Sequence, residues 1–270
     1  MDLKLSGKVV IVTGATANIG RAIALGFADE GVKLVAVGRD RAAGERVVEL
    51  AHKRGASEAV FVEADLLDRE APARIVAAAE QLGPIQVLVN NVGGNVTAGM
   101  FVDSDPDTWQ GDIDLNLLTV LRMTHAVLPG MIERKAGRII NLGSTAGLVG
   151  DYMLSVYSTA KAAVHGFTTV LAKEVGQHNI TVNAVAPYGT VSDDPEAFSQ
   201  GSRFRPESQF FKELGKADAA DRAKMQRTGG VLDRKIARPE EVAGAVLYLA
   251  SDSASFVTGQ IVKVEGGTLL

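Results

Sequence analysis

The chain has 270 residues, enough for one large domain with a substantial core, and 46% of them are hydrophobic, which excludes a disordered chain. It carries 28 basic and 32 acidic residues, so it has no broad basic surface and nucleic-acid binding is not expected. It has no cysteine, which excludes disulfides, thiolate catalysis and cysteine-bound zinc.

Short β-branched runs alternate with alanine- and leucine-rich stretches along the chain. Seven runs are predicted to be strands: Lys8–Thr13, Lys33–Val37, Ala59–Val62, Gln86–Asn90, Arg138–Leu142, Thr181–Ala186 and Gln260–Val264. Six helices are expected between them, near 18–30, 41–54, 68–82, 106–134, 155–178 and 239–250. Several strands are apolar almost throughout, as expected when helices cover both faces of a sheet. The alternation predicts a single α/β domain over residues 1–270, with parallel strands joined by right-handed crossovers.

No segment of the sequence has the character of a membrane anchor. Residues 1–8 lack the apolar stretch of a secretory signal, and the longest apolar runs, such as Val9–Val12 and Leu34–Val37, have only the length of strands. We therefore expect a cytoplasmic protein that does not cross a membrane.

A glycine-rich turn joins the first strand to the first helix, in Thr13-Gly14-Ala15-Thr16-Ala17-Asn18-Ile19-Gly20. Such a turn lets the backbone approach a pyrophosphate, and the helix that follows presents free N–H groups and the positive end of its dipole. Asn18 stands where a third glycine is expected, and asparagine tolerates left-handed backbone better than most residues. The turn predicts a dinucleotide site formed by Gly14, Thr16, Asn18, Ile19 and Gly20.

The second strand ends at Val37-Gly38-Arg39-Asp40. A carboxylate at this place usually holds the adenosine ribose hydroxyls of NAD, whereas an arginine offers a cation for the 2′-phosphate of NADP. Gly38 leaves room and Arg39 supplies the cation, so NADP(H) is favoured over NAD(H). Asp40 keeps NAD(H) open as the alternative, if its carboxylate turns toward the ribose.

Tyr157 and Lys161 lie four residues apart in a predicted helix and therefore share one face. A neighbouring ammonium lowers the pKa of a phenol, so Tyr157 can take a proton from an alcohol, or give one to a ketone, as hydride moves. Ser144 follows the predicted strand 138–142, where its hydroxyl can orient the reacting oxygen. The Tyr–Lys spacing alone is a weak signal, but with Ser144 and the glycine turn it predicts an oxidoreductase that interconverts a secondary alcohol and a ketone.

These residues together resemble the short-chain dehydrogenase/reductase superfamily, over nearly the whole chain. The resemblance implies a Rossmann-like doubly wound sheet of seven parallel strands, in the order 3-2-1-4-5-6-7 with helices on both faces. It also implies a homotetramer packed through the long helices.

The resemblance assigns further site residues. Asp65 and Leu66 match the element that contacts the adenine, and Asn90-Asn91-Val92-Gly93 matches the Asn-Asn-Ala-Gly element. Asn116 matches the asparagine that holds a water in a proton relay behind the lysine. The expected catalytic residues are Asn116, Ser144, Tyr157 and Lys161. Beyond the glycine turn and Arg39, the expected cofactor contacts are Asp65, Leu66, Asn91, Gly93, Tyr157, Lys161, Pro187 and Thr190.

Two segments depart from the family pattern. Asn18 replaces the usual middle glycine, which predicts rearranged pyrophosphate contacts. After the sixth strand the chain reads Pro187-Tyr188-Gly189-Thr190-Val191-Ser192 instead of Pro-Gly, so either Thr190 or Ser192 supplies the family's hydroxyl. Residues 188–235 form a long segment with nine basic and eight acidic residues, which we interpret as a substrate lid, with a surface insertion as the alternative.

The substrate remains open between several classes. The expected lining residues are mostly apolar: Val96, Leu148, Val149, Met153, Leu154 and Tyr188. They favour an apolar cyclic or aromatic small molecule. A 3-oxoacyl carrier-protein reductase is the alternative, although the nearly balanced charge of residues 188–235 offers no clear docking patch for an acidic carrier. A non-catalytic dinucleotide-binding regulator and an epimerase or dehydratase are further alternatives, and no metal site is expected because the four histidines are scattered.

Overall fold

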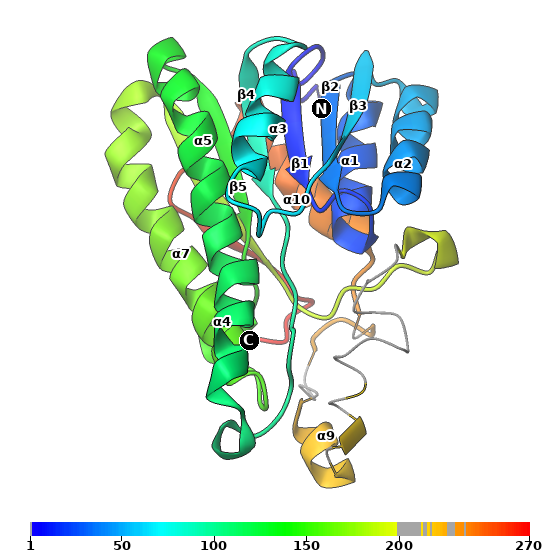
Figure 1. The fold of residues 1–270 in the computed structure, drawn as a ribbon, viewed down its shortest axis with the longest axis vertical. Coiled ribbons are helices and arrows are strands. Elements are labelled where there is room, and N and C mark those ends of the chain that lie inside the picture. Colours follow the sequence, from blue (N-terminus) through cyan, green and yellow to red (C-terminus); the bar gives the residue numbers. More distant parts are fainter. Residues whose placement is uncertain (1, 199–211, 213–214, 217, 226–229, 235) are drawn as a thin grey trace.

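The structure is a computed structural model that describes residues 2–198, 212, 215–216, 218–225, 230–234 and 236–270. Seven parallel strands form one sheet in the order β3-β2-β1-β4-β5-β6-β7, which confirms the fold class and the strand order (Figure 1). The strands are β1 (Val9–Thr13), β2 (Lys33–Gly38), β3 (Glu58–Glu63), β4 (Ile85–Asn90), β5 (Gly137–Leu142), β6 (Ile180–Pro187) and β7 (Ile261–Val264).

Helices cover both faces of the sheet. The larger ones are α1 (Asn18–Asp29), α2 (Arg41–Arg54), α3 (Ala71–Glu80), α4 (Pro106–Ile113), α5 (Thr119–Arg134), α7 (Ser155–Val175) and α10 (Pro239–Ala250). Two short ones are α6 (Ala146–Val149) and α9 (Ala219–Met225). Figure 1 shows α1 beside α2 on one side and α5 beside α7 on the other.

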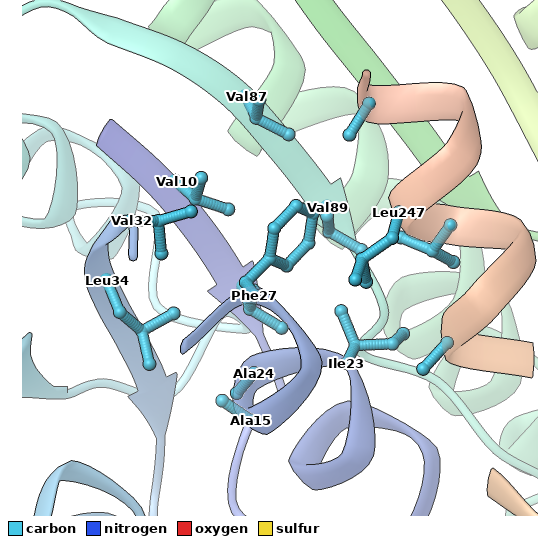
Figure 2. Close-up of a cluster of buried hydrophobic side chains, with 14 of the residues drawn as sticks. Val10, Ala15, Ile23, Ala24, Phe27, Val32, Leu34, Val87, Val89 and Leu247 are labelled. Carbon is cyan, nitrogen blue, oxygen red and sulfur yellow. The ribbon is translucent and has the colours of Figure 1, made fainter. Parts of the chain in front are cut away.

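Side-chain alternation along the strands divides the core into two layers, because successive residues of a strand point to opposite faces. Val10 and Val12 of β1 pack with α1, α2 and α10, whereas Val9 and Ile11 pack with α3, α5 and α7. Figure 2 shows the Phe27 ring of α1 in the first layer, near strand and α10 side chains. Burial on both faces explains why these strands are apolar almost throughout.

The predicted helix 106–134 is divided by a π-helical turn, Asp114–Leu118, between α4 and α5. The amide of Asn116 donates to the carbonyl oxygen of Asp112 (2.9 Å), four residues earlier, a position that a regular helix reserves for a backbone N–H. Two other departures are smaller. Helix α6 was not predicted, and neither was α9, which lies within the long segment 188–235.

Within the described residues, one helical stretch, Pro106–Arg134, is long and apolar enough to cross a membrane by length and composition alone. Its Met123, Val127 and Met131 side chains are buried in the core layer that faces α3 and α7. The stretch therefore forms part of the core of this α/β domain.

All seven strands are parallel, so their carboxyl ends lie at the same end of the sheet. The glycine turn follows β1, Asn91 to Gly94 follow β4, Ser144 follows β5, and Tyr188 follows β6. Strand order reverses between β1 and β4, and ligands of open α/β sheets bind in the crevice beyond such a switch point. The fold thus gathers the predicted site residues from distant parts of the chain.

Candidate active site

The glycine turn is compact, and its glycines are required by contacts. Gly14 has a left-handed backbone (φ +63°), and a Cβ placed on Gly20 would lie 2.0 Å from the carbonyl oxygen of Gly14. The amide of Asn91 donates to the carbonyl oxygens of Thr13 (3.0 Å) and Gly14 (3.1 Å). Asn91 therefore braces the turn from the neighbouring strand.

The N-terminus of α1 fits a bound pyrophosphate. Ala17 is the N-cap residue, and no side chain accepts a hydrogen bond from the first amides of this helix in the part of the chain that the structure describes. The first four N–H groups of a helix have no intrahelical partner and together attract an anion. With Gly14 and Gly20 leaving no side chain in the way, this donor set suits the phosphates of a dinucleotide.

The end of β2 places Arg39 and Asp40 differently. The Asp40 carboxylate accepts from the backbone N–H of Ala43 (3.0 Å) and thereby caps α2. Arg39 is exposed and lies 3.7 Å from the Asp65 carboxylate, a loose ion pair. A Cβ on Gly38 would lie 2.6 Å from the Thr16 methyl group, which explains the glycine. Leu66, beside Asp65, is buried.

Ser144, Tyr157 and Lys161 are all buried beyond the carboxyl ends of β5 and β6. The Lys161 ammonium lies 5.9 Å from the centroid of the Tyr157 ring and donates to the carbonyl oxygen of Leu142 (2.8 Å), at the end of β5. Gly147 of α6 contacts the Lys161 backbone so closely that a Cβ would lie 2.6 Å from its carbonyl carbon. Since α6 follows Ser144 almost directly, this contact joins the serine segment to the Tyr–Lys helix.

Asn116 is fully buried and holds the loop after β4. Its amide donates to the carbonyl oxygen of Gly94 (2.9 Å), and its Oδ1 accepts from the Gly94 N–H (2.9 Å). A Cβ on Gly93 would lie 2.8 Å from Asn116 Oδ1 and 2.9 Å from Lys161 Nζ. Gly93 therefore leaves room where the lysine and the asparagine approach one another.

The segment after β6 uses both candidate hydroxyls internally. The Thr190 hydroxyl donates to the carbonyl oxygen of Tyr188 (2.6 Å), and the Ser192 hydroxyl accepts from the N–H of Asp194 (3.2 Å). The carbonyl oxygen of Pro187 accepts from the N–H of Thr145 (3.1 Å), which joins this segment to the residue after Ser144. Tyr188 lies in a small pocket with Leu232, Ile236 and Val264.

Two buried residues of this site were missed by the sequence analysis. Asp112 accepts from the Val96 N–H (3.0 Å) and the Thr97 hydroxyl (3.1 Å), so it fixes the loop that carries Val96. Burial raises the pKa of its carboxyl. His165 lies one turn after Lys161 and packs on Gly143, whose Cβ would be 2.2 Å from Nε2. Asp112 stands among other polar residues of its helix, such as Asp107 and Gln110, so no sequence signal distinguished it.

The buried His165 side chain is expected to make the fold less stable in acid. Burial and the nearby Lys161 charge lower its pKa to about 4, against 6.5 for the free side chain, and the Gly147 backbone offsets this only in part. As the pH falls, the unfolded chain binds a proton before the folded one does, so stability present above about pH 6.5 is lost toward pH 4. Urea unfolding measures the free energy of unfolding. Between pH 7.5 and pH 5.0 this free energy should fall by about 2 kcal/mol more in the wild type than in His165→Leu. An equal loss in both proteins would exclude His165 as the cause.

Known proteins are similar to this chain in sequence and in fold. A family model described as short chain dehydrogenase matches residues 8–201. The chain is 35% identical over 266 residues to the 3-oxoacyl-[acyl-carrier-protein] reductase FabG of Pseudomonas aeruginosa, covering 98% of each protein. It is 33% identical over 269 residues to the protein of the same name from Thermotoga maritima, covering 99% of this chain and 100% of that protein.

A solved structure is also similar to this chain over nearly its whole length. The crystal structure of a 3-oxoacyl-[acyl-carrier protein] reductase with bound NAD from Brucella melitensis has a TM-score of 0.79 and 31% identity, and covers 98% of this chain and 92% of that chain. Sequence and fold therefore agree over the whole length, and the chain belongs to the short-chain dehydrogenase/reductase family.

Proposed function

We propose that the protein is an NADP(H)-dependent reductase of 3-oxoacyl thioesters, which it converts to the 3-hydroxy compounds. The observation that carries the reaction type is the placement of Ser144, Tyr157 and Lys161 beside the glycine turn at one end of the sheet. Full-length similarity to reductases of this name supports the substrate class.

Each catalytic residue has a distinct part in reduction. A nicotinamide bound at this site would supply the hydride. The Ser144 hydroxyl donates a hydrogen bond to the carbonyl oxygen and holds it, and the Tyr157 hydroxyl gives that oxygen its proton. The Lys161 ammonium stabilises the phenolate that remains, because opposite charges attract strongly in a buried site.

The loop after β4 supports the lysine. Asn116 holds Gly94 through two hydrogen bonds, and Gly93 leaves space beside the Lys161 ammonium. We assign Asn116 to the relay that returns a proton to Tyr157 through Lys161, as in the family. The first amides of α1 would hold the cofactor phosphates, and Asn91 holds the glycine turn that precedes them.

Arg39 is the proposed determinant of NADP(H) preference. Asp40 is engaged as the cap of α2, whereas the exposed Arg39 guanidinium can leave its loose contact with Asp65 to bind a 2′-phosphate. Arg39→Ala should raise the dissociation constant for NADPH by about 10- to 100-fold and leave that for NADH unchanged, since hydrogen bonds to charged groups are the stronger ones.

Arg41 provides a matched control for this measurement by fluorescence titration. Its guanidinium lies 2.7 Å from the Glu63 carboxylate and is already paired. Arg41→Ala should therefore keep the NADPH preference. A preference for NADH in the wild type, or an equal loss of NADPH affinity in both variants, would refute the role of Arg39.

Among the described residues, the expected apolar lining residues differ in their exposure. Met153 is buried, but Leu148 and Val149 are 40% and 59% exposed. Within the part of the chain that the structure describes, Leu148 and Val149 thus present exposed apolar surface, whereas a rigid cyclic substrate needs a pocket that buries most of its area. A flexible acyl chain can lie along such an exposed apolar surface. We therefore prefer 3-oxoacyl thioesters to cyclic or aromatic ketones as the substrate.

The substrate class is tested by following NADPH absorbance with the purified protein and two sets of carbonyl compounds. One set contains 3-oxoacyl thioesters of coenzyme A and of an acyl carrier protein, and the other contains cyclic and aromatic ketones. We expect higher kcat/KM for the thioesters. Turnover of the cyclic ketones alone would overturn the substrate class and leave the oxidoreductase assignment standing.

We also propose that residues 188–235 act as the lid of this site. The Tyr152 hydroxyl, in the loop before Tyr157, donates to the Asp221 carboxylate of α9 (2.9 Å). Gly189 and Val191 exchange backbone hydrogen bonds with Ala237 (2.9 and 3.2 Å), so the two ends of the segment are held together. This geometry supports a loop that is closed at its base and reaches the catalytic loop.

A cytoplasmic homotetramer is proposed from the family resemblance. Val170 of α7, one of the helices through which the resemblance implies packing, is 52% exposed. Light scattering on the purified protein should give four times the mass of the chain.

A further inference from the structure

The chain after β6 returns across the carboxyl end of the sheet to α1. We call the five residues Thr190–Asp194 of this segment the strap. The Asn18 amide donates to the carbonyl oxygen of Thr190 (3.0 Å), and its Oδ1 accepts from the Ser192 N–H (3.0 Å). The strands β4 and β5 lie between β6 and β1, so the carboxyl ends of β6 and β1 are roughly 14 Å apart at the usual strand spacing. The strap therefore passes over the ends of the strands that carry the site.

The replacement of glycine by asparagine at position 18 is explained by this contact. Asn18 has a left-handed backbone (φ +43°), which asparagine and glycine adopt most readily. Its side chain is buried, and its primary amide offers a donor and an acceptor on two separate atoms of one short side chain. Asparagine thus keeps the backbone shape of the glycine turn and adds two hydrogen bonds to a segment more than 170 residues away.

A second link from α1 supports the first. The Arg21 guanidinium, one turn further along the helix, lies 2.9 Å from the Asp194 carboxylate. On its other side the strap is paired through backbone groups, because the N–H of Val191 donates to the carbonyl oxygen of Ala237 (3.2 Å). The strap is therefore held between the cofactor turn and the residues that precede α10.

We propose that Asn18 is a positioning residue that fastens the strap over the bound dinucleotide and slows its release. The proposal rests on the proposed function, since it takes a nicotinamide dinucleotide as the occupant of the turn. A dinucleotide that leaves the crevice has to part the strap from α1, which breaks both Asn18 hydrogen bonds and the Arg21 ion pair.

The test uses three variants of the whole chain. Asn18→Gly restores the family residue and keeps the left-handed backbone, but removes both hydrogen bonds. Arg21→Gln removes the ion pair. Asn179→Gly is the matched control, because Asn179 also has a left-handed backbone (φ +55°) but ends the 3-10 turn after α7.

Two measurements are made on each protein. Hydrogen exchange without cofactor reports how firmly residues 189–194 are held. Stopped-flow fluorescence, with NADPH displaced by excess NADP⁺, reports the rate of release. We expect Asn18→Gly to exchange faster in the strap and to release NADPH about tenfold faster, the size expected for two lost hydrogen bonds. Arg21→Gln should show a smaller change in the same direction, and Asn179→Gly neither.

The outcomes separate this proposal from the proposed function. Unchanged exchange in Asn18→Gly would refute the fastening. Faster exchange with unchanged or slower release would refute the effect on the cofactor, and would leave Asn18 as a substitute for glycine. Failure of the wild type to bind NADPH or NADH would refute the proposed function together with the retention of cofactor, while hydrogen exchange would still decide whether Asn18 fastens the strap.

Discussion

Tyr157→Phe is expected to lower kcat by about 10²–10⁴-fold, the usual contribution of a positioned acid or base. The change removes the hydroxyl that gives the reacting oxygen its proton and keeps the ring that packs beside Lys161. The first amides of α1, which we assign to the cofactor phosphates, are untouched. The dissociation constant for the cofactor should therefore stay close to that of the wild type.

Tyr248→Phe is the control for this comparison, because Tyr248 lies on α10 and is 40% exposed. It makes the same chemical change away from the catalytic helix, and kcat should not move. Steady-state kinetics gives kcat, and fluorescence titration gives the cofactor dissociation constant, for the wild type, Tyr157→Phe and Tyr248→Phe. Wild-type kcat in Tyr157→Phe would remove Tyr157 from the mechanism.

Gly20→Ala is expected to abolish most cofactor binding. The added Cβ would lie 2.0 Å from the Gly14 carbonyl oxygen and 2.4 Å from the Asn91 amide, so α1 and the glycine turn have to separate. Overpacking of this kind costs about 1–3 kcal/mol, and up to about a 100-fold rise in the cofactor dissociation constant would follow from a shift of the phosphate-binding amides.

Gly26→Ala separates this local clash from a general effect of alanine in α1. A Cβ on Gly26 would meet the Leu247 methyl groups at 3.4 Å and the Ala243 Cβ at 4.0 Å, which are ordinary contacts. Alanine is also the better helix former, so this variant should be equally stable or gain up to about 1 kcal/mol. Equal cofactor affinity in both variants would contradict the close packing of the glycine turn.

The repeating pattern of strands and helices was sufficient to predict the sheet. β1 and β6, for example, begin and end within a residue or two of the predicted runs, because apolar β-branched runs of this length form strands when both faces are covered. The π-helical turn at Asn116 was not predictable in this way, because the apolar pattern continues through it and does not reveal the side-chain hydrogen bond from Asn116 to the Asp112 carbonyl oxygen.

In the candidate site, too, local features were predictable from the sequence and long-range contacts were not. Tyr157 and Lys161 were proposed from local spacing, and the structure places the Lys161 ammonium 5.9 Å from the Tyr157 ring, while their catalytic roles with Ser144 stay a prediction. The role of Asn18 could not be predicted from its neighbours, since its partners Thr190 and Ser192 are more than 170 residues away. The sequence analysis identified the departure from glycine, but the three-dimensional structure was needed to find the contact that explains it.

The most direct test of the account is the transfer of deuterium from NADPH labelled at C4 to a 3-oxoacyl thioester, followed by mass spectrometry of the product. Both C4-labelled epimers of NADPH are used, so that either face of the nicotinamide is covered. We expect a 3-hydroxyacyl product with one deuterium at carbon 3 from one of the two epimers, and about 10²–10⁴-fold slower formation of that product by Tyr157→Phe under the same conditions. A product without deuterium from either epimer, or no product with bound cofactor, would contradict it.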